Sequence, residues 1–246
     1  MSNIFVKDKQ LVLPGEVVAE GMDYLPSYGI FRDNDQLVAN KIGLVSIDNR
    51  LIKLIPLTGT YTPKVGDTVI GRIVNVGFSG WTVDFGFSNL AQLPVRDATN
   101  EFVDKRSDLT QYFDFDDLIV TKISNLSKGN LVDLTMKNPG LFKLSKEKGR
   151  LIDITPSKVP RVIGKQGSMI SILKNLTNCK ISVGQNGKIW VEGDGEEMAV
   201  KAIELIERES HLPGLTEKIE KLLGGNNAVH EEKWWKKIWP DKRNGS

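Results

Sequence analysis

Residues 162–170 read VIGKQGSMI, which is an apolar pair, two glycines three positions apart and the start of an amphipathic helix. Because glycine has no Cβ, Gly164 and Gly167 let a phosphate–sugar backbone lie against the main chain at the positive N-terminal end of that helix. The same G-x-x-G spacing recurs over 77–80 and 184–187, as expected by chance among 23 glycines. The meaning of the middle pair therefore depends on the elements around it.

Those elements form an α/β pattern from about residue 150 onward. The predicted elements are a strand over 151–154, a short helix between Pro156 and Pro160, a helix to about 176, strands over 180–183 and 188–192, and a last helix after Asp194. This β-α-α-β-β-α order, with the G-x-x-G stretch, resembles the type I KH domain, which we place over 148–212. In that family the loop holds single-stranded RNA.

The resemblance implies that the loop and its flanks bind RNA. Lys165 adds a cation at the place where a phosphate would lie. Some KH folds are packing modules that bind no RNA, so a structural role for the loop is the alternative. The residues assigned to RNA binding are Arg161, Ile163, Gly164, Lys165, Gln166 and Gly167.

The net charge of +2, from 33 Lys and Arg against 31 Asp and Glu, hides a segregation of charge along the chain. Residues 141–184 hold nine Lys and Arg against two Asp and Glu, whereas residues 192–210 hold two against seven. If the basic residues share a face, that face is the usual footprint of a phosphate-backbone ligand.

Upstream, five strand-like pieces follow a turn at 63–67. They cover 68–76, 81–85, 91–95, 118–124 and 131–137, and the last alternates polar and apolar residues with period 2. With a longer acidic connection over 96–117, they predict a five-stranded OB-type barrel, placed over 61–140. Residues 71–74 (GRIV) and 83–86 (VDFG) resemble the G-x-V and V-D-x-G signatures of the ribosomal-protein-S1-like RNA-binding domain.

The barrel departs from that family at two positions where the family stacks bases on a Phe and a His. These positions correspond to Thr82 and Pro94. Phe78 and Trp81 remain as candidate stacking platforms, and a place in the barrel core is the equal alternative for both. The cations that can follow phosphates are Arg72, Arg96, Lys122 and Lys128.

The two ends of the chain are less regular. Residues 1–60 carry short apolar runs between turn signals and predict a small β domain of three to five strands, which we expect to lean on a neighbour or partner. Residues 213–246 predict a short helix and a tail with Trp234, Trp235 and Trp239. Docking on protein is our preferred interpretation of that tail, and stacking on RNA or an interfacial membrane helix stays open.

The whole order resembles the S1/KH RNA-binding cap subunit of the archaeal exosome, of the ribosomal-RNA-processing type. The stretch LPGE over 13–16 fits the N-terminal domain of that family. The resemblance implies a non-catalytic subunit, three copies of which dock through this domain on a hexameric ring of RNase PH-like subunits. These copies bind single-stranded RNA and guide its 3′ end to 3′→5′ degradation. A free-standing RNA regulator and an exoribonuclease are the alternatives.

No residue pattern indicates catalysis, a metal site or a cofactor. Cys179 is the single cysteine, and His211 and His230 have no companion cluster. The acidic stretch 114–117 is expected to be a solvated loop. The apolar stretches are too short to span a bilayer and the N-terminus shows no secretion signal, so we expect a soluble cytoplasmic protein.

Overall fold

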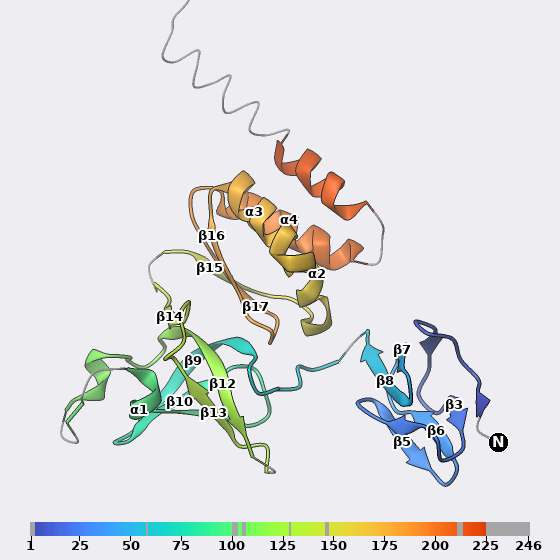
Figure 1. Cartoon of the computed structure of the whole chain (residues 1–246). Coiled ribbons are helices and arrows are strands. Elements are labelled where there is room, and N and C mark those ends of the chain that lie inside the picture. The colour runs from blue at the N-terminus through green and yellow to red at the C-terminus, as the bar shows by residue number, and fades with distance from the viewer. Residues whose placement is uncertain are drawn as a thin grey trace, which may run out of the picture. The chain divides into compact units, whose positions relative to one another are not determined.

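The computed structural model describes residues 3–224 apart from 58, 100–102, 105–106, 128, 146–147 and 211–213. The chain forms two compact units, residues 1–60 and residues 61–246 (Figure 1). Lys128 and the tryptophan-rich tail, both singled out from the sequence, lie outside the described residues. The first unit is all β, and the second combines a barrel with an α/β domain.

The N-terminal unit consists of two four-stranded sheets, ordered β1-β3-β6-β5 and β2-β7-β8-β4, that share one apolar core. The prediction of three to five strands is wrong, because the described part of this unit holds eight. Strands of two residues are too short to show a period in the sequence. The strands are β1 (Asn3–Ile4), β2 (Leu11–Val12), β3 (Val17–Glu20), β4 (Leu25–Pro26), β5 (Ile30–Asp33), β6 (Gln36–Ala39), β7 (Gly43–Asp48) and β8 (Leu51–Pro56).

The predicted barrel is present in the second unit. Its strands are β9 (Thr68–Val76), β10 (Gly80–Asp84), β11 (Ala91–Pro94), β12 (Leu118–Leu126) and β13 (Val132–Thr135). They close in the order β9-β10-β11-β13-β12, with β11 and β13 parallel and all other pairs antiparallel. This is the five-stranded OB arrangement. Outside the barrel, β14 (Phe142–Lys143) pairs with β12.

The acidic connection between β11 and β12 contains α1 (Val95–Ala98) and the 3₁₀ turn η1 (Leu109–Gln111). The expectation that residues 114–117 form a solvated loop needs a correction at Asp117, which is only 2% exposed. Its Oδ2 accepts a hydrogen bond from the backbone N–H of Asp114 at 2.7 Å and lies 2.5 Å from Lys143 Nζ. A carboxylate removed from water needs such partners, so Asp117 holds β14 against the barrel.

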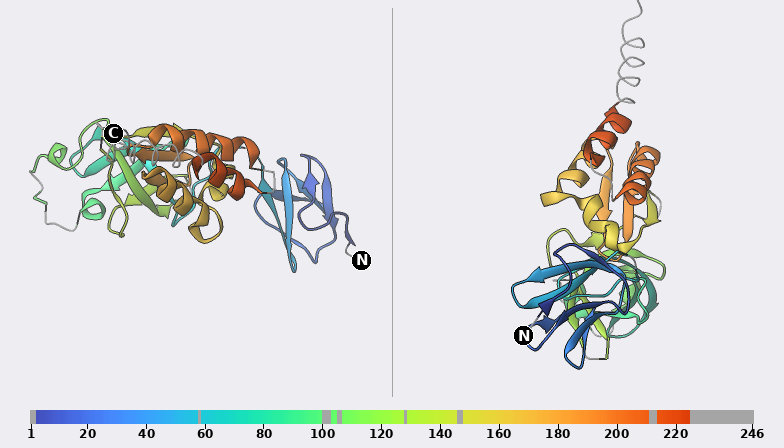
Figure 2. Two further views of the ribbon diagram at one scale, coloured as in Figure 1. Left: turned by 90° about the horizontal axis from the view of Figure 1, so that it is seen from above. Right: turned by 90° about the vertical axis from the view of Figure 1, so that its right-hand side faces the viewer.

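The α/β domain follows with the predicted β-α-α-β-β-α order. Its sheet has the order β15-β17-β16, and one face is covered by the helices. A further helical segment over 215–224 buries Leu215, Ile219 and Leu223 in the same core (Figure 2). The elements are β15 (Arg150–Asp153), η2 (Pro156–Lys158), α2 (Val159–Ile163), η3 (Lys165–Gly167), α3 (Ser168–Thr177), β16 (Lys180–Val183), β17 (Lys188–Glu192) and α4 (Glu196–Glu209).

Barrel and α/β domain are joined through the turn between β16 and β17. Asn186 in this turn is 8% exposed, and its Nδ2 donates to the carbonyls of Ile70 at 2.8 Å and Phe85 at 2.7 Å. Its Oδ1 accepts from the backbone N–H of Ile70 at 3.2 Å. Beside it, Trp190 belongs to a small apolar cluster with residues of the barrel. The two parts of this unit are therefore held together by a polar and an apolar contact.

Candidate nucleic-acid interface

The middle G-x-x-G pair lies on the surface, between α2 and α3. The side chains of Lys165 and Gln166 are exposed, as is that of Arg161 at the end of α2. Ile163 is half-buried and packs against the core of the domain. The six residues predicted from the sequence are thus brought together in one loop and the last turn of the helix before it.

The two glycines of this loop are required for different reasons. Gly164 has φ +75°, and a Cβ there would lie 2.6 Å from the backbone nitrogen of Met169. Gly167 has φ +80°, but the nearest atom to its Cβ would be Ile170 Cγ2 at 3.9 Å. Gly164 is therefore fixed by packing against α3, whereas a Cβ at Gly167 would make only an ordinary contact.

The electrostatics at the start of α3 favour an anion. The N-cap, Gly167, has no side chain to cap the helix, and the first turn of this helix contains no acidic residue. The N–H groups at the start of a helix carry a partial positive charge, which a phosphate oxygen can neutralise. Lys165, two residues before the cap, adds a full positive charge next to these groups.

The two aromatic candidates of the barrel differ in their exposure to solvent. Phe78, at the tip of the turn between β9 and β10, is fully exposed, with a relative accessibility of 101%. Trp81 is completely buried, its Nε1 donates to the carbonyl of Phe113 at 2.8 Å, and its ring meets that of Phe113 edge to face. The expectation that Trp81 offers a stacking platform is corrected, because its ring faces are covered inside the barrel. Phe78 remains.

A hollow of about 580 Å³ lies on one side of the β9–β10 turn. It includes both positions, Thr82 and Pro94, at which the S1 family carries stacking residues. Gln92 Nε2 donates to Thr82 Oγ1 across the strands at 3.4 Å. The lining residues are Asn75, Gly77, Ser79, Gly80, Thr82, Gln92, Leu93, Pro94, Val95 and Arg96.

Sequence reasoning missed Asn75 and Gln92 as members of this surface. The available signal was alternation, because polar residues on a strand whose neighbours are buried must face outward. On β11, Ala91 and Leu93 are buried while Gln92 is exposed. The polar part of the lining therefore consists of amides, hydroxyls and Arg96, next to apolar residues such as Pro94 and Val95, and none of the lining residues is aromatic.

A second hollow, of about 520 Å³, lies at the same turn and includes Phe78. Its other wall is η1, where the Asp108 carboxylate accepts hydrogen bonds from the N–H and Oγ1 of Thr110 at 3.0 and 2.8 Å. These two hydrogen bonds lower the pKa of Asp108. The lining residues are Val76, Gly77, Phe78, Ser107, Asp108, Leu109 and Thr110.

The predicted cations of the barrel occupy different surroundings. Arg72 on β9 is about half exposed and forms an ion pair with Asp116 at 2.6 Å. Arg96 on α1 is 84% exposed, lines the first hollow and contacts its neighbour Asp97 at 3.2 Å. Lys122 on β12 is half-buried. Of the three predicted cations that the structure describes, Arg96 is the one at the edge of a hollow.

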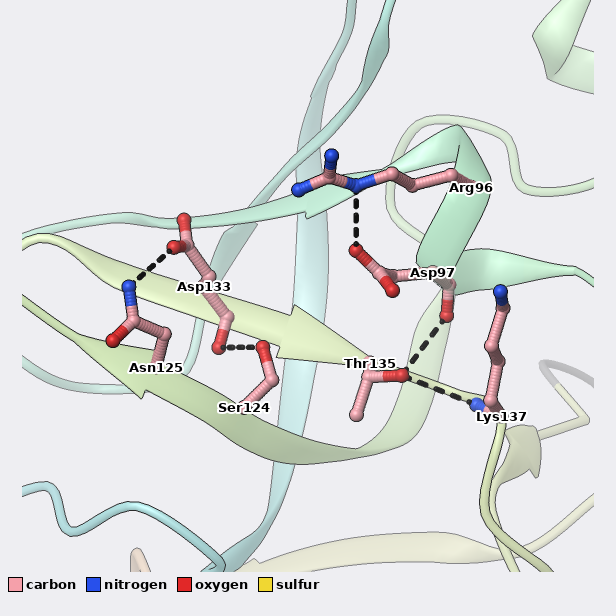
Figure 3. A network of polar contacts seen from close by, with 7 residues as sticks. All are labelled: Arg96, Asp97, Ser124, Asn125, Asp133, Thr135 and Lys137. Carbon is pink, nitrogen blue, oxygen red and sulfur yellow. Dashed lines mark hydrogen bonds and ion pairs between the residues drawn. The ribbon is translucent and has the colours of Figure 1, made fainter.

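A polar network holds α1 in place (Figure 3). The carbonyl of Asp97 accepts hydrogen bonds from the N–H of Met136 at 2.7 Å and from Thr135 Oγ1 at 3.3 Å. On β13, which also carries Thr135, the carbonyl and the carboxylate of Asp133 accept hydrogen bonds from the side chains of Ser124 and Asn125 on β12. Arg96 therefore projects from a helical turn that is anchored to the barrel on its C-terminal side.

The described residues contain no group of three or more His, Cys, Asp or Glu that could hold a metal ion. Among the same residues, no helix combines the length and the apolar character that crossing a membrane requires.

Two family models match the chain at the domains described above. Residues 60–125 match the S1 domain of RRP4, and residues 150–208 match the KH domain. The chain is therefore a two-module protein in which an S1 domain and a KH domain follow an N-terminal β unit.

Relatives named exosome complex component Rrp4 match over most of their own length. That of Pyrococcus horikoshii is 46% identical over 227 residues, which are 91% of this chain and 85% of the relative. That of Methanothermus fervidus is 44% identical over 223 residues, 89% of this chain and 97% of the relative. The chain belongs to this Rrp4 family of exosome components. A crystal structure described as that of a candidate exosome complex RNA-binding protein is 35% identical, with a TM-score of 0.61 over 70% of this chain and 99% of that one.

Proposed function

We propose that this chain is a non-catalytic RNA-binding cap subunit of an exosome, a 3′→5′ RNA-degrading complex. The observation that carries the proposal is that one compact unit, in a member of the Rrp4 family, exposes both surfaces to which we assign RNA binding. These are the loop over 164–167 and the β9–β10 turn with Phe78. RNA bound here is delivered to an active site in other subunits.

The two surfaces bind a single strand in complementary ways. The loop takes a phosphate between Lys165 and the start of α3, and Phe78 stacks on a base, which contributes about 1–3 kcal/mol per base. Arg72, Arg96, Lys122 and Lys128 add phosphate contacts along the barrel. Two weak sites on one body, repeated in three copies, give tight binding through their high effective concentration.

The N-terminal unit is the docking part of this proposal. Leu11, Leu44 and Ile55 form a cross-strand row on the outer face of the sheet β2-β7-β8-β4. Leu25 and Leu51 pair on β4 and β8 of the same sheet. Leu11, Leu25 and Ile55 are 50%, 57% and 49% exposed. Such an exposed apolar group marks a protein-interaction site, and we assign it to a hexameric ring of RNase PH-like subunits.

The experiment is a gel assay with labelled oligo(A) RNA, phosphate and Mg²⁺, with and without an RNase PH-like ring. We expect the protein alone to shift the RNA without shortening it and to accelerate shortening by the ring. Ile55→Asp should keep the shift and lose the acceleration. Shortening by the protein alone would mean that the chain is itself a nuclease.

A further inference from the structure

The hollow at Thr82 has a chemistry that differs from the stacking surface of the S1 family. Its polar lining comes mainly from Asn75, Ser79, Thr82 and Gln92, two amides and two hydroxyls. Each of these groups can donate and accept a hydrogen bond. None of the lining residues is aromatic, and only Arg96 offers a guanidinium plane, which can also stack on a base. Beside the positive charge of Arg96, the hollow therefore suits a ligand group that both donates and accepts hydrogen bonds.

The hydrogen-bonding capacity of this lining is largely available to a ligand. Asn75, Ser79 and Gln92 are exposed, and Thr82 is half-buried. The two contacts between the side chains of Gln92 and Thr82, at 3.4 and 3.5 Å, are both longer than a usual hydrogen bond. Replacing them by bonds to a ligand therefore costs little.

The geometry of the hollow is fixed before a ligand arrives. Across the turn, the N–H of Gly77 donates to the carbonyl of Gly80 at 2.9 Å, and the N–H of Val95 donates to that of Ser79 at 3.0 Å. A Cβ on Gly80 would lie 2.2 Å from the carbonyl oxygen of Leu93. The turn is thus packed directly on β11 and joined to α1, and a ligand finds the polar groups already in place.

We infer that this hollow binds a ribose of the RNA strand and recognises its 2′-hydroxyl through Thr82 and Gln92. The 2′-hydroxyl donates and accepts a hydrogen bond, as the lining does, and it is the group that distinguishes RNA from DNA. Arg96 at the edge supplies the cation for an adjoining phosphate. Phe78, on the second hollow at the same turn, stacks on a base of either kind of strand. The inference rests on the proposed function, and it assigns the protein's preference for RNA over DNA to this site.

The test compares the binding of one sequence as single-stranded RNA and as DNA, by fluorescence anisotropy with the complete chain. We expect Thr82→Val and Gln92→Ala each to weaken RNA binding by about 3- to 10-fold, the value of one hydrogen bond, and to leave DNA binding unchanged. Phe78→Ala should weaken both by a similar factor, about 10-fold. Gln36→Ala, an exposed strand glutamine of the N-terminal unit, is the matched control and should change neither.

A second series locates the recognised sugar. RNA strands with a single deoxynucleotide at successive positions should lose affinity at one or two positions with the wild-type protein and at none with the Thr82→Val/Gln92→Ala double variant. Equal losses for RNA and DNA in the single variants, or no loss at all, would overturn the inference and leave the proposed function standing. A wild-type protein that binds no RNA would overturn the proposed function itself. Thermal unfolding checks that each variant is folded.

Discussion

The loops 164–167 and 184–187 share one sequence pattern, G-x-x-G with a carboxamide in the third position, and lie in opposite surroundings. Gln166 in the first is exposed, whereas Asn186 in the second is buried and makes three hydrogen bonds to the barrel. The difference lies outside the motif, because the second loop meets backbone groups of Ile70 and Phe85 in the barrel. A glycine pair therefore shows only where the chain can turn tightly, and its surroundings decide whether it binds a ligand or a neighbouring domain.

The glycines of the two loops make the same point. A Cβ on Gly184 would lie 2.9 Å from the backbone nitrogen of Ile70, and one on Gly187 would lie 2.2 Å from the carbonyl oxygen of Ile154. Both positions are filled by protein. In the first loop only Gly164 is closely packed, and a Cβ on Gly167 would make an ordinary contact with Ile170 Cγ2 at 3.9 Å. A loosely packed position beside a glycine is thus the better sign of a ligand site than the glycine itself.

The largest effect is expected when the buried amide is removed. Asn186→Ala leaves the N–H and carbonyl of Ile70 and the carbonyl of Phe85 without these partners, which should lower the free energy of unfolding by about 4 kcal/mol. Urea unfolding followed by tryptophan fluorescence measures this, since Trp190 lies at the same junction. The control is Gln185→Ala in the same turn, where the contact to Thr68 uses the backbone N–H. A similar cost for both variants would contradict the role given to Asn186.

The sequence predicted the order of the domains and their elements well, for a physical reason. Barrel strands such as β9 and β12 are nine residues long, enough for alternation and flanking turns to be visible. The helices around Gly164 are marked by glycine and by apolar spacing. In contrast, β1, β2 and β4 of the N-terminal unit have two residues each, and their pairing depends on partners distant in the chain.

The site was predicted less completely, because solvent exposure depends on register and on distant contacts. Phe78 and Trp81 stand in one loop sequence, and only the start of β10 at Gly80 turns Trp81 inward. Asn186 and Ile70 are 116 positions apart, so no local pattern reveals their contact. The position of the loop over 164–167 between two helices was predicted because its signal lies within a few neighbouring residues of the sequence.

A second comparison lies within the loop over 164–167. Gly164→Ala forces a methyl group against the backbone of Met169 and a side chain into φ +75°, so we expect a loss of about 3 kcal/mol in stability. For Gly167→Ala we expect a loss of only about 1 kcal/mol, which is the cost of placing a side chain in the left-handed conformation at φ +80°. Thermal unfolding of the two variants gives the ranking. Equal losses would show that Gly167 is as closely packed as Gly164.

The smallest effect is expected when the charge of Lys165 is reversed. Lys165→Glu should weaken RNA binding by about 10-fold at moderate salt and reduce the slope of log K against log salt by about 1, because one phosphate contact is lost. The stability of the protein should be unchanged, since the side chain is exposed. Binding is measured by anisotropy over a salt series.

Two controls connect this measurement to the comparison of the loops. Lys201→Glu, on the exposed face of α4, makes the same change of charge away from the loop. Gln185→Glu adds one negative charge to the G-x-x-G loop that is docked on the barrel. If the salt slope changes for Lys165→Glu alone, a phosphate lies at the first loop and not at the second. If Lys201→Glu changes it as much as Lys165→Glu, and Gln185→Glu changes it by about half as much, the RNA responds only to the net charge of the domain, and the loop over 164–167 has no phosphate site of its own.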